Sequence, residues 1–166
     1  MKKSVYIHKF KTKLGWFRLA STENGLAIIN FTDPVGFKSD MKKRFGDFQI
    51  KAGGVMNKKA EKQIESYLAG KLKKFSLKLD LEGTTFQRRV LGKVGSIPYG
   101  KTITYGKIAA SVGNSKAARA VGSVNAGNAL PIVIPCHRVL AANGLGGYAG
   151  GLKLKKYLLN LENVEY

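Results

Sequence analysis

The chain has 166 residues, 44% of them hydrophobic, which suits one ordinary domain or two small ones and excludes a disordered chain. Its single cysteine excludes an internal disulfide, and its N-terminal segment has no apolar run long enough for a signal peptide or a membrane span, so we expect a soluble, cytoplasmic protein. The 29 lysines and arginines against 10 acidic residues give a formal net charge of +19; such a surface provides solubility alone or, as we favour, concentrates a polyanion, nucleic acid above all.

Residues 1–80 are predicted to form an α/β domain that ends in a linker. Three strand-like runs predict a small antiparallel sheet: 4–7, 14–19 and 25–31, the last stopped by Thr-Asp-Pro at 32–34. Between Asn57 and Leu68 the apolar residues recur at helical spacing, which predicts a helix with Asn57 as its N-cap and Gly70 as its stop. A Lys-rich connection over 71–81 then leads to the second half.

Residues 81–166 are predicted to form a mostly α-helical domain. Its first helix covers 86–94, where the apolar residues share one face and Thr85 is the expected cap. The segments 104–112 and 115–122 are typical of two helices joined by a tight turn, which is the outline of a helix-turn-helix. Short helix pairs also occur in proteins that do not bind DNA, and it is the net charge that favours DNA binding here.

The second helix of this pair carries few side chains that read bases. Its small residues are Ala117, Ala118, Ala120, Gly122 and Ser123. Such a surface suits either close approach to DNA with little sequence readout or packing against another helix. Arg119 is the one long side chain in the run, and we expect it to probe a groove or the base stack.

The chain's one cysteine, Cys136, directly precedes one of its two histidines, His137. A lone cysteine is commonly a small buried hydrophobe, whereas a reactive one needs a group that takes its proton. Neighbours in sequence do not face each other on a helix or strand, so we expect His137 to act through a bridging water. Glu162 ends a run without acidic residues, 83–161, and follows an amphipathic helix over 152–161. It is either a surface glutamate at a frayed helix end or the partner of His137. An anion beside a helix C-terminus is disfavoured by the helix dipole, so we expect a cation or a hydrogen-bond donor next to it.

The segment 143–151 is dense in glycine, which lets backbone approach a ligand closely, and Tyr148 offers a flat face for stacking on a ring. No G-x-G-x-x-G motif follows a strand and opens a helix, so we expect no dinucleotide or methyl-donor cofactor. His8 and the pair 136–137 are the only soft ligands, so we expect no structural zinc site.

Several stretches, from about residue 60 to the C-terminus, together resemble the O6-alkylguanine-DNA alkyltransferases. They are 81–90, 104–106, 117–122, Asn128, 134–139, 147–152 and 157–162. The resemblance implies a repair protein that flips an alkylated guanine out of double-stranded DNA and moves the alkyl group from O6 to its own cysteine. It also implies a ribonuclease-H-like N-terminal domain, a winged-helix-like C-terminal domain, and a monomer that binds the minor groove with low sequence specificity.

By this resemblance, Cys136 is the alkyl acceptor, His137 is the water-mediated base, and Glu162 orients that base. Tyr105 would donate a hydrogen bond to the flipped base and crowd the phosphate that rotates. The product is a thioether, which no nearby group can hydrolyse, so each protein molecule would act once.

The resemblance also assigns the surroundings of the acceptor. Tyr148 and the main chain of Val139 would line the guanine pocket, and Asn128 would tie the helix-turn-helix to the active-site loop through backbone hydrogen bonds. Ala149 stands where many relatives have serine, so it would serve through its backbone N–H alone. Relatives that bind zinc in the N-terminal domain do so through cysteines, which this chain lacks there.

On the DNA side, Arg119 would fill the gap that the flipped base leaves in the stack. The small residues around it would contact the minor groove: Ala117, Ala118, Ala120 and Gly122. Two other classes of protein stay open. A cysteine hydrolase built on Cys136, a histidine and Asn128 has the wrong residue order, and a sensor of alkylated bases without catalysis would not need Cys136.

Overall fold

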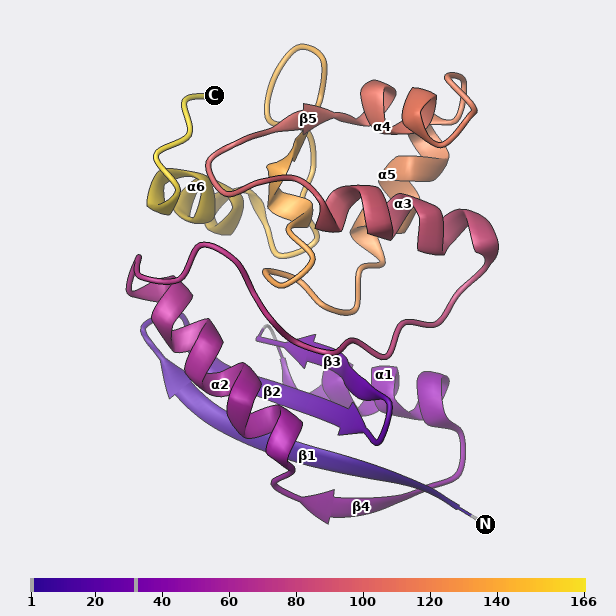
Figure 1. Ribbon diagram of the computed structural model, residues 1–166, viewed down its shortest axis with the longest axis vertical. Helices are drawn as coiled ribbons and strands as arrows, with labels where there is room; N and C mark the ends of the chain where they lie inside the picture. The colour runs from indigo at the N-terminus through magenta and orange to yellow at the C-terminus, as the bar shows by residue number, and fades with distance from the viewer. Residues whose placement is uncertain (1, 32) are drawn as a thin grey trace. The chain divides into compact units, whose positions relative to one another are not determined.

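The computed structural model describes residues 2–31 and 33–166, so Thr32, part of the expected stop after the third strand, lies outside it. The chain divides into two compact units, Met1–Leu81 and Glu82–Tyr166 (Figure 1). No helix among the described residues is long and apolar enough to cross a membrane.

The first unit contains a four-stranded sheet in the order β3-β2-β1-β4. Its strands are β1 (Lys3–Thr12), β2 (Gly15–Thr22), β3 (Gly25–Asn30) and β4 (Phe48–Ala52). The three predicted strands are confirmed as the antiparallel β1, β2 and β3. The sheet as a whole is mixed, because β4 pairs parallel to β1 at its edge. The sequence pattern did not reveal β4, since this short strand has no fully buried residue that would set up an alternation.

Two helices cover the sheet, α1 (Pro34–Phe45) on one face and α2 (Val55–Leu68) on the other (Figure 1). The first of them was not predicted, because Asp33 and Pro34 were interpreted only as the end of a strand. They also start a helix: the Asp33 side chain accepts a hydrogen bond from the Gly36 N–H, and proline suits the first turn. The predicted N-cap of α2 was wrong, since the cap is Gly54.

Asn57 instead lies inside α2, where its buried amide ties the helix to the sheet. Its Nδ2 donates to the Tyr6 carbonyl at 3.0 Å and to the Gly53 carbonyl at 2.7 Å. The core on the α1 side of the sheet consists of Val5, Ala20, Ala27, Ile28, Phe37, Met41 and Phe45. The β3 edge is covered by the linker, because Leu26 exchanges backbone hydrogen bonds with Lys78 and Asp80. The hydrophobic faces of sheet and helices thus account for the stability of this unit.

The second unit contains four α-helices in its described part: α3 (Thr85–Gly95), α4 (Tyr105–Ser111), α5 (Ala118–Ala126) and α6 (Leu152–Leu161). The cap of α3 is Thr84, one residue before the predicted Thr85, and its hydroxyl forms a capping box with Gln87. The helices α4 and α5 form the expected helix-turn-helix pair, although α5 begins three residues later than predicted.

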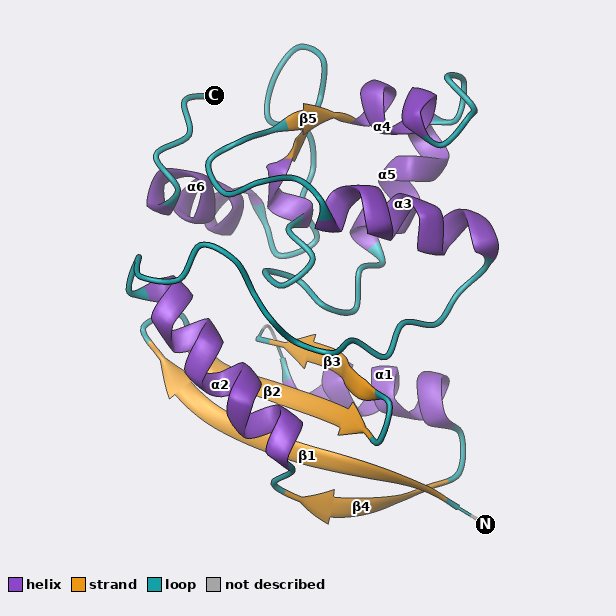
Figure 2. Cartoon of the chain, viewed as in Figure 1, coloured by secondary structure: helices purple, strands orange, loops and turns teal. Residues whose placement is uncertain are grey.

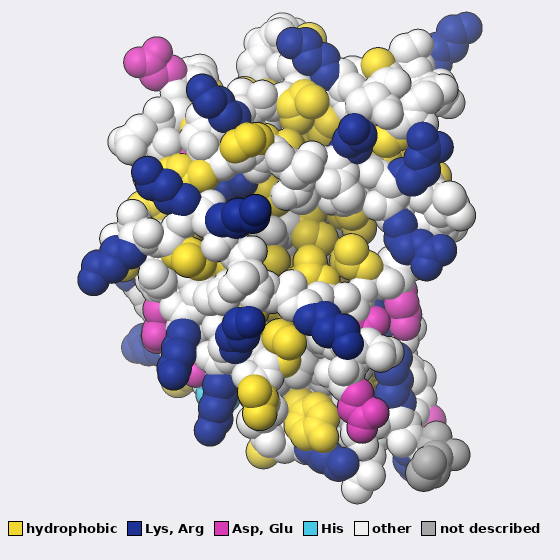
Figure 3. All heavy atoms as spheres, viewed as in Figure 1, with side chains coloured by type: hydrophobic (Ala, Val, Ile, Leu, Met, Phe, Trp, Pro, Cys, Tyr) yellow, Lys and Arg dark blue, Asp and Glu magenta, His cyan; other side chains and the backbone are white. Residues whose placement is uncertain are grey.

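Most of the chain between α5 and α6 is loop (Figure 2). It is interrupted by a single 3-10 turn, Cys136–Arg138, and by β6 (Val139–Leu140), which pairs parallel to β5 (Ile103–Thr104). Figure 3 shows one face of the surface, where lysine and arginine side chains are widely spread and acidic ones are few. The excess of basic side chains on this face has the same sign as the net charge of the chain.

Candidate active site

Cys136 begins the 3-10 turn and is buried, with 4% of its surface exposed. Its backbone N–H donates to the Ile134 carbonyl at 2.8 Å. Its carbonyl accepts a hydrogen bond from Asn125 Nδ2 at 3.1 Å, and Asn125 lies on the buried face of α5. The helix that was expected to contact DNA is therefore bonded directly to the backbone of the cysteine.

Burial raises the pKa of the Cys136 thiol above its ordinary value. The side chains of Asn128 and Tyr148 and the Lys155 charge act in the opposite direction, since each stabilises the thiolate. The resting group is therefore a protonated thiol in an environment prepared for the anion. A reaction at this sulfur needs a base that removes the proton.

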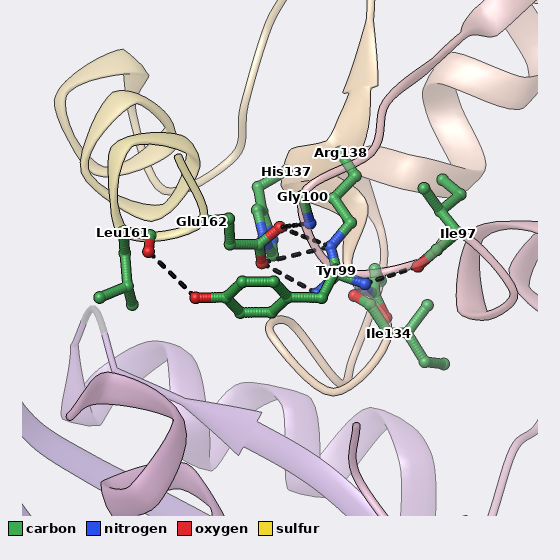
Figure 4. Close-up of polar contacts among 9 residues, drawn as sticks. Ile97, Tyr99, Gly100, Ile134, His137, Arg138, Leu161 and Glu162 are labelled. Atoms are coloured by element: carbon green, nitrogen blue, oxygen red, sulfur yellow. Dashed lines mark hydrogen bonds and ion pairs between the residues drawn. The ribbon is translucent and has the colours of Figure 1, made fainter. Parts of the chain in front are cut away.

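The base candidate, His137, is fully buried and faces Glu162 (Figure 4). Its Nε2 lies 2.8 Å from Glu162 Oε1. An ionised carboxylate only accepts hydrogen bonds, so Nε2 carries the hydrogen and Nδ1 keeps the lone pair. Burial lowers the pKa of His137, with Glu162 opposing the shift and the Arg138 and Lys155 charges adding to it. The ring is therefore neutral at neutral pH, as a general base requires.

Glu162 is 3% exposed and lies at the C-cap of α6, so it is not a frayed surface residue. Besides His137, it accepts hydrogen bonds from Arg138 Nε at 2.9 Å, from Arg138 Nη2 at 2.9 Å and from the Gly100 N–H at 3.1 Å (Figure 4). The carboxylate thus has the cation and the donors that a buried anion at a helix C-terminus needs.

Arg138 was missed as a site residue by the sequence reasoning. Its Nη1 donates to the Ile97 carbonyl at 2.5 Å, and its guanidinium lies over the Tyr99 ring at 5.7 Å. The Tyr99 hydroxyl donates to the Leu161 carbonyl at 3.0 Å (Figure 4). One signal in the sequence could have found it. Glu162 follows the long acid-free run 83–161, and a buried carboxylate needs a cation beside it. Arg138 directly follows His137, the expected partner of Glu162.

Lys155 was also missed, and it is fully buried. Its Nζ donates to three carbonyls, those of Val139 at 2.7 Å, Leu145 at 2.5 Å and Gly147 at 3.0 Å. Burial lowers its pKa to about 8, while the charge of Cys136 raises it. The signal was helical spacing, because Lys155 lies on the same face of α6 as the buried Leu158, Leu159 and Glu162.

A pocket of about 440 Å³ opens between α5 and the glycine-rich loop. Its lining residues are Tyr105, Gly122, Asn125, Ala126, Gly147, Tyr148 and Ala149. The predicted pocket residues Tyr105, Tyr148 and Ala149 therefore come together, and the Tyr105 hydroxyl donates to the Gly147 carbonyl at 3.4 Å. Val139 does not line this pocket; it is fully buried, and its carbonyl is bonded to Lys155.

Asn128 follows α5 and bonds to the segment that leads to Cys136. Its Nδ2 donates to the Ile134 carbonyl at 2.8 Å, and its Oδ1 accepts from the Leu130 N–H at 3.0 Å. Arg119 and Ala120 are exposed on α5, whereas Ala117, Ala118 and Gly122 are half-buried. Of these five, only Gly122 reaches the pocket. The α5 helix thus presents an exposed arginine and small side chains outside the pocket.

The described residues contain no cluster of three or more His, Cys, Asp and Glu side chains that could hold a metal ion. His8, the other histidine, lies in the first unit, where its Nε2 is 2.6 Å from Glu61 Oε2.

The chain matches two family models, the ribonuclease-like domain of 6-O-methylguanine DNA methyltransferase over residues 5–81 and its DNA-binding domain over residues 85–164. It is 44% identical over 159 residues to the methylated-DNA–protein-cysteine methyltransferase of Methanosarcina acetivorans, covering 95% of this chain and 98% of that protein. It is 49% identical over 109 residues to the constitutive enzyme of that name from Bacillus subtilis, covering 64% of this chain and 66% of that protein.

Among solved structures, it is similar to the Mycobacterium tuberculosis protein OGT in complex with DNA, with a TM-score of 0.81, 34% identity and coverage of 95% of this chain and 93% of the other. The O6-methylguanine-DNA methyltransferase of Pyrococcus kodakaraensis gives a TM-score of 0.68 at 27% identity, covering 96% and 99% of the two chains. Both domains match in sequence and in fold, and the chain belongs to the O6-methylguanine DNA methyltransferase family.

Proposed function

We propose that this protein repairs double-stranded DNA by moving an alkyl group from O6 of guanine to Sγ of Cys136. The observation that carries the proposal is a buried Cys136 that is followed by a neutral, oriented His137 and is bonded through its carbonyl to Asn125, which lines a pocket of about 440 Å³. The relatives named methylated-DNA–protein-cysteine methyltransferases support the same reaction.

In the proposed reaction, the Cys136 proton passes through one water to Nδ1 of His137, and Glu162 and its hydrogen bonds stabilise the imidazolium that forms. The thiolate attacks the alkyl carbon, so a sulfur–carbon bond forms while the carbon–O6 bond breaks. The electron pair of the broken bond stays with the guanine, which then takes up a proton. No group in the site hydrolyses the thioether, so the protein is consumed in one turnover and needs no cofactor.

The guanine is expected to enter the pocket after it flips out of the duplex. Tyr105 donates a hydrogen bond to the base there and crowds the rotating phosphate, while Tyr148 and the Ala149 backbone form the walls. Cys136 lies next to this pocket through Asn125, which lines it and bonds to the Cys136 carbonyl. The buried Val139 contributes indirectly, because its carbonyl fixes Lys155.

The α5 helix is the proposed DNA contact, in the minor groove. Its small residues permit close approach without base readout, so we expect low sequence specificity, and the exposed Arg119 fills the gap in the stack. We expect a monomer that acts in the cytoplasm. The net charge of +19 supplies the general attraction to DNA.

The first test is the intact mass of the protein after mixing with excess duplex that contains O6-methylguanine, followed by peptide mapping. We expect one added methyl group per protein molecule, located on Cys136. The Cys136→Ala variant should bind the same duplex with an unchanged mass. An unchanged mass for the wild type, together with tight binding, would instead identify a sensor of alkylated bases.

The DNA contact is tested with Arg119→Ala. Loss of the side chain that replaces the flipped base should slow transfer from duplex substrate by about tenfold or more, given a stacking contribution of roughly 1–3 kcal/mol. Transfer from a single-stranded oligonucleotide should change much less, because no base stack has to be filled. Equal slowing on both substrates would place Arg119 outside the base stack. Lys116→Ala, an exposed residue before α5, is the matched control for lost charge.

A further inference from the structure

An apolar cleft lies in the first unit, whereas Cys136 belongs to the second. The cleft has a volume of about 600 Å³ and lies between α1 and the sheet face formed by β1, β2 and β4. Ile7, Phe37, Met41 and Ile50 are among the apolar side chains that line it. Ile50 is 54% exposed, so the helix leaves part of this sheet face uncovered. The proposed alkyl transfer gives this cleft no role.

The charge around the cleft has one sign. Lys9, Arg18 and Lys38 line it, and among the described residues that line it none is acidic. An occupant that matches these walls combines aliphatic groups with negative charge. The apolar lining of the cleft is mainly aliphatic, with Phe37 and Phe48 as its aromatic members, whereas nucleic-acid bases bind chiefly by stacking on aromatic side chains.

The edge of the sheet beside the cleft is open. β4 is the last strand in the order β3-β2-β1-β4, whereas the opposite edge is covered by the linker at Leu26. The Gly53 N–H donates to the Ile7 carbonyl, so by strand alternation the backbone groups of Ile50 and Ala52 point away from β1. Both of these side chains line the cleft. An extended peptide paired to β4 would therefore place every second side chain beside the cleft.

We infer that this cleft and the β4 edge together form a docking site for an extended acidic segment of another protein, in which aliphatic residues alternate with aspartate or glutamate. The open edge supplies main-chain hydrogen bonds, the apolar walls accept the aliphatic side chains, and Lys9, Arg18 and Lys38 attract the acidic ones. A second copy of this chain is disfavoured as the occupant by its net charge of +19.

The test is a titration of the full-length protein with a synthetic peptide in which isoleucine alternates with glutamate. Trp16, the only tryptophan, lies across from Lys11 on the β1–β2 hairpin and under the Lys9 ammonium at 5.4 Å, so its fluorescence reports binding next to the cleft. We expect saturable binding that Lys38→Glu and Arg18→Glu each weaken by about tenfold. Lys62→Glu, the same charge change on the exposed side of α2, should leave the affinity within about twofold.

Two further measurements distinguish the inferred docking from non-specific electrostatic binding and from nucleic-acid binding. A peptide of the same composition, with its isoleucines and glutamates in separate blocks, should bind far more weakly, and equal binding would overturn the docking site. Displacement of the alternating peptide by single-stranded oligothymidylate, with the same sensitivity to Lys38→Glu, would also overturn it in favour of nucleic acid. The Cys136→Ala protein should bind the peptide as the wild type does, because the cleft and Cys136 lie in different units.

Discussion

The two units of this protein differ in what they bury. Among the described residues, the buried polar side chains of the first unit are all uncharged: Ser21, Thr22, Asn30 and Asn57. The described histidine, arginine, lysine and glutamate side chains that are buried all lie in the second unit: His137, Arg138, Lys155 and Glu162. Buried charges are costly and add little net stability even when they are paired. The second unit therefore keeps them for chemistry, while the first relies on its apolar core.

The two units also satisfy their backbones differently. In the first unit, the strands pair their N–H and C=O groups with one another, and the Asn57 side chain adds two hydrogen bonds to carbonyls. In the second, three side chains bond directly to carbonyls of the loop between α5 and α6, namely those of Asn125, Asn128 and Lys155. The active-site loop thus depends on a few polar groups, and single substitutions there should affect structure and reaction together.

The difference in what the two units bury is tested most strongly by comparing two single variants, Glu162→Ala in the second unit and Ile64→Ala in the core of the first. Removing Glu162 leaves the buried Arg138 and His137 without their anion, so we expect a loss of about 3–5 kcal/mol in the free energy of unfolding. Transfer should slow by about a hundredfold, because His137 loses its orientation.

Ile64 is fully buried in α2, and its truncation should cost about 2–5 kcal/mol through the cavity it leaves. Its transfer rate, measured where the protein is folded, should equal that of the wild type. Urea titration and single-turnover transfer assays measure the two quantities. If Glu162→Ala transferred the alkyl group at the wild-type rate, Glu162 would contribute to the stability of the second unit and not to its reaction.

The fold could be predicted from the sequence wherever local pattern and packing agree. The strands β1 to β3 and the helices of the second unit follow from periodicity. The helix α1 was missed although Phe37, Met41 and Phe45 recur at helical spacing and pack on the sheet, because Pro34 was taken as a stop only. The edge strand β4 has no such signal, since its exposed residues pair through backbone that any sequence supplies.

The candidate site could be predicted from the sequence only where a residue type is unusual in this chain. Cys136, His137 and Glu162 are residue types that stand out by their scarcity in this chain. Arg138 and Lys155 are two of 29 lysines and arginines, and only tertiary contacts distinguish them from surface residues. Their burial depends on partners far away in sequence, such as Ile97 for Arg138, which no local pattern specifies.

The dependence of the loop on single polar groups is tested next by Lys155→Met. Methionine fits the space but leaves the Val139, Leu145 and Gly147 carbonyls without this donor, so we expect a loss of about 1–3 kcal/mol in stability. Transfer should slow by at least about tenfold, because the pocket loop and the thiolate both lose their cation.

A pH profile of the transfer rate distinguishes positioning from mere structural support. In the wild type, Lys155 loses its charge above its pKa of about 8, so the increase in rate that thiol ionisation brings should level off there. In Lys155→Met no charge remains to be lost, and the rate should continue to rise with pH. Identical profiles for the two proteins would show that Lys155 supports the loop without acting on the thiolate.

The smallest expected effect is the pH dependence of stability that His137 introduces into the second unit. Its folded-state pKa is lowered from the ordinary value of 6.5, chiefly by burial, so below pH 6.5 the unfolded chain binds a proton that the folded chain resists. The unfolded state then binds more protons, and the free energy of unfolding falls as pH decreases from 6.5, by at most about 1.4 kcal/mol per pH unit from this group. His137→Gln keeps a donor for Glu162 and removes the titration, so urea titrations across this range should show a shallower slope for the variant. Equal slopes would mean that the folded site accepts the proton as readily as the unfolded chain, and His137 would then be charged in mild acid and unable to act as the base.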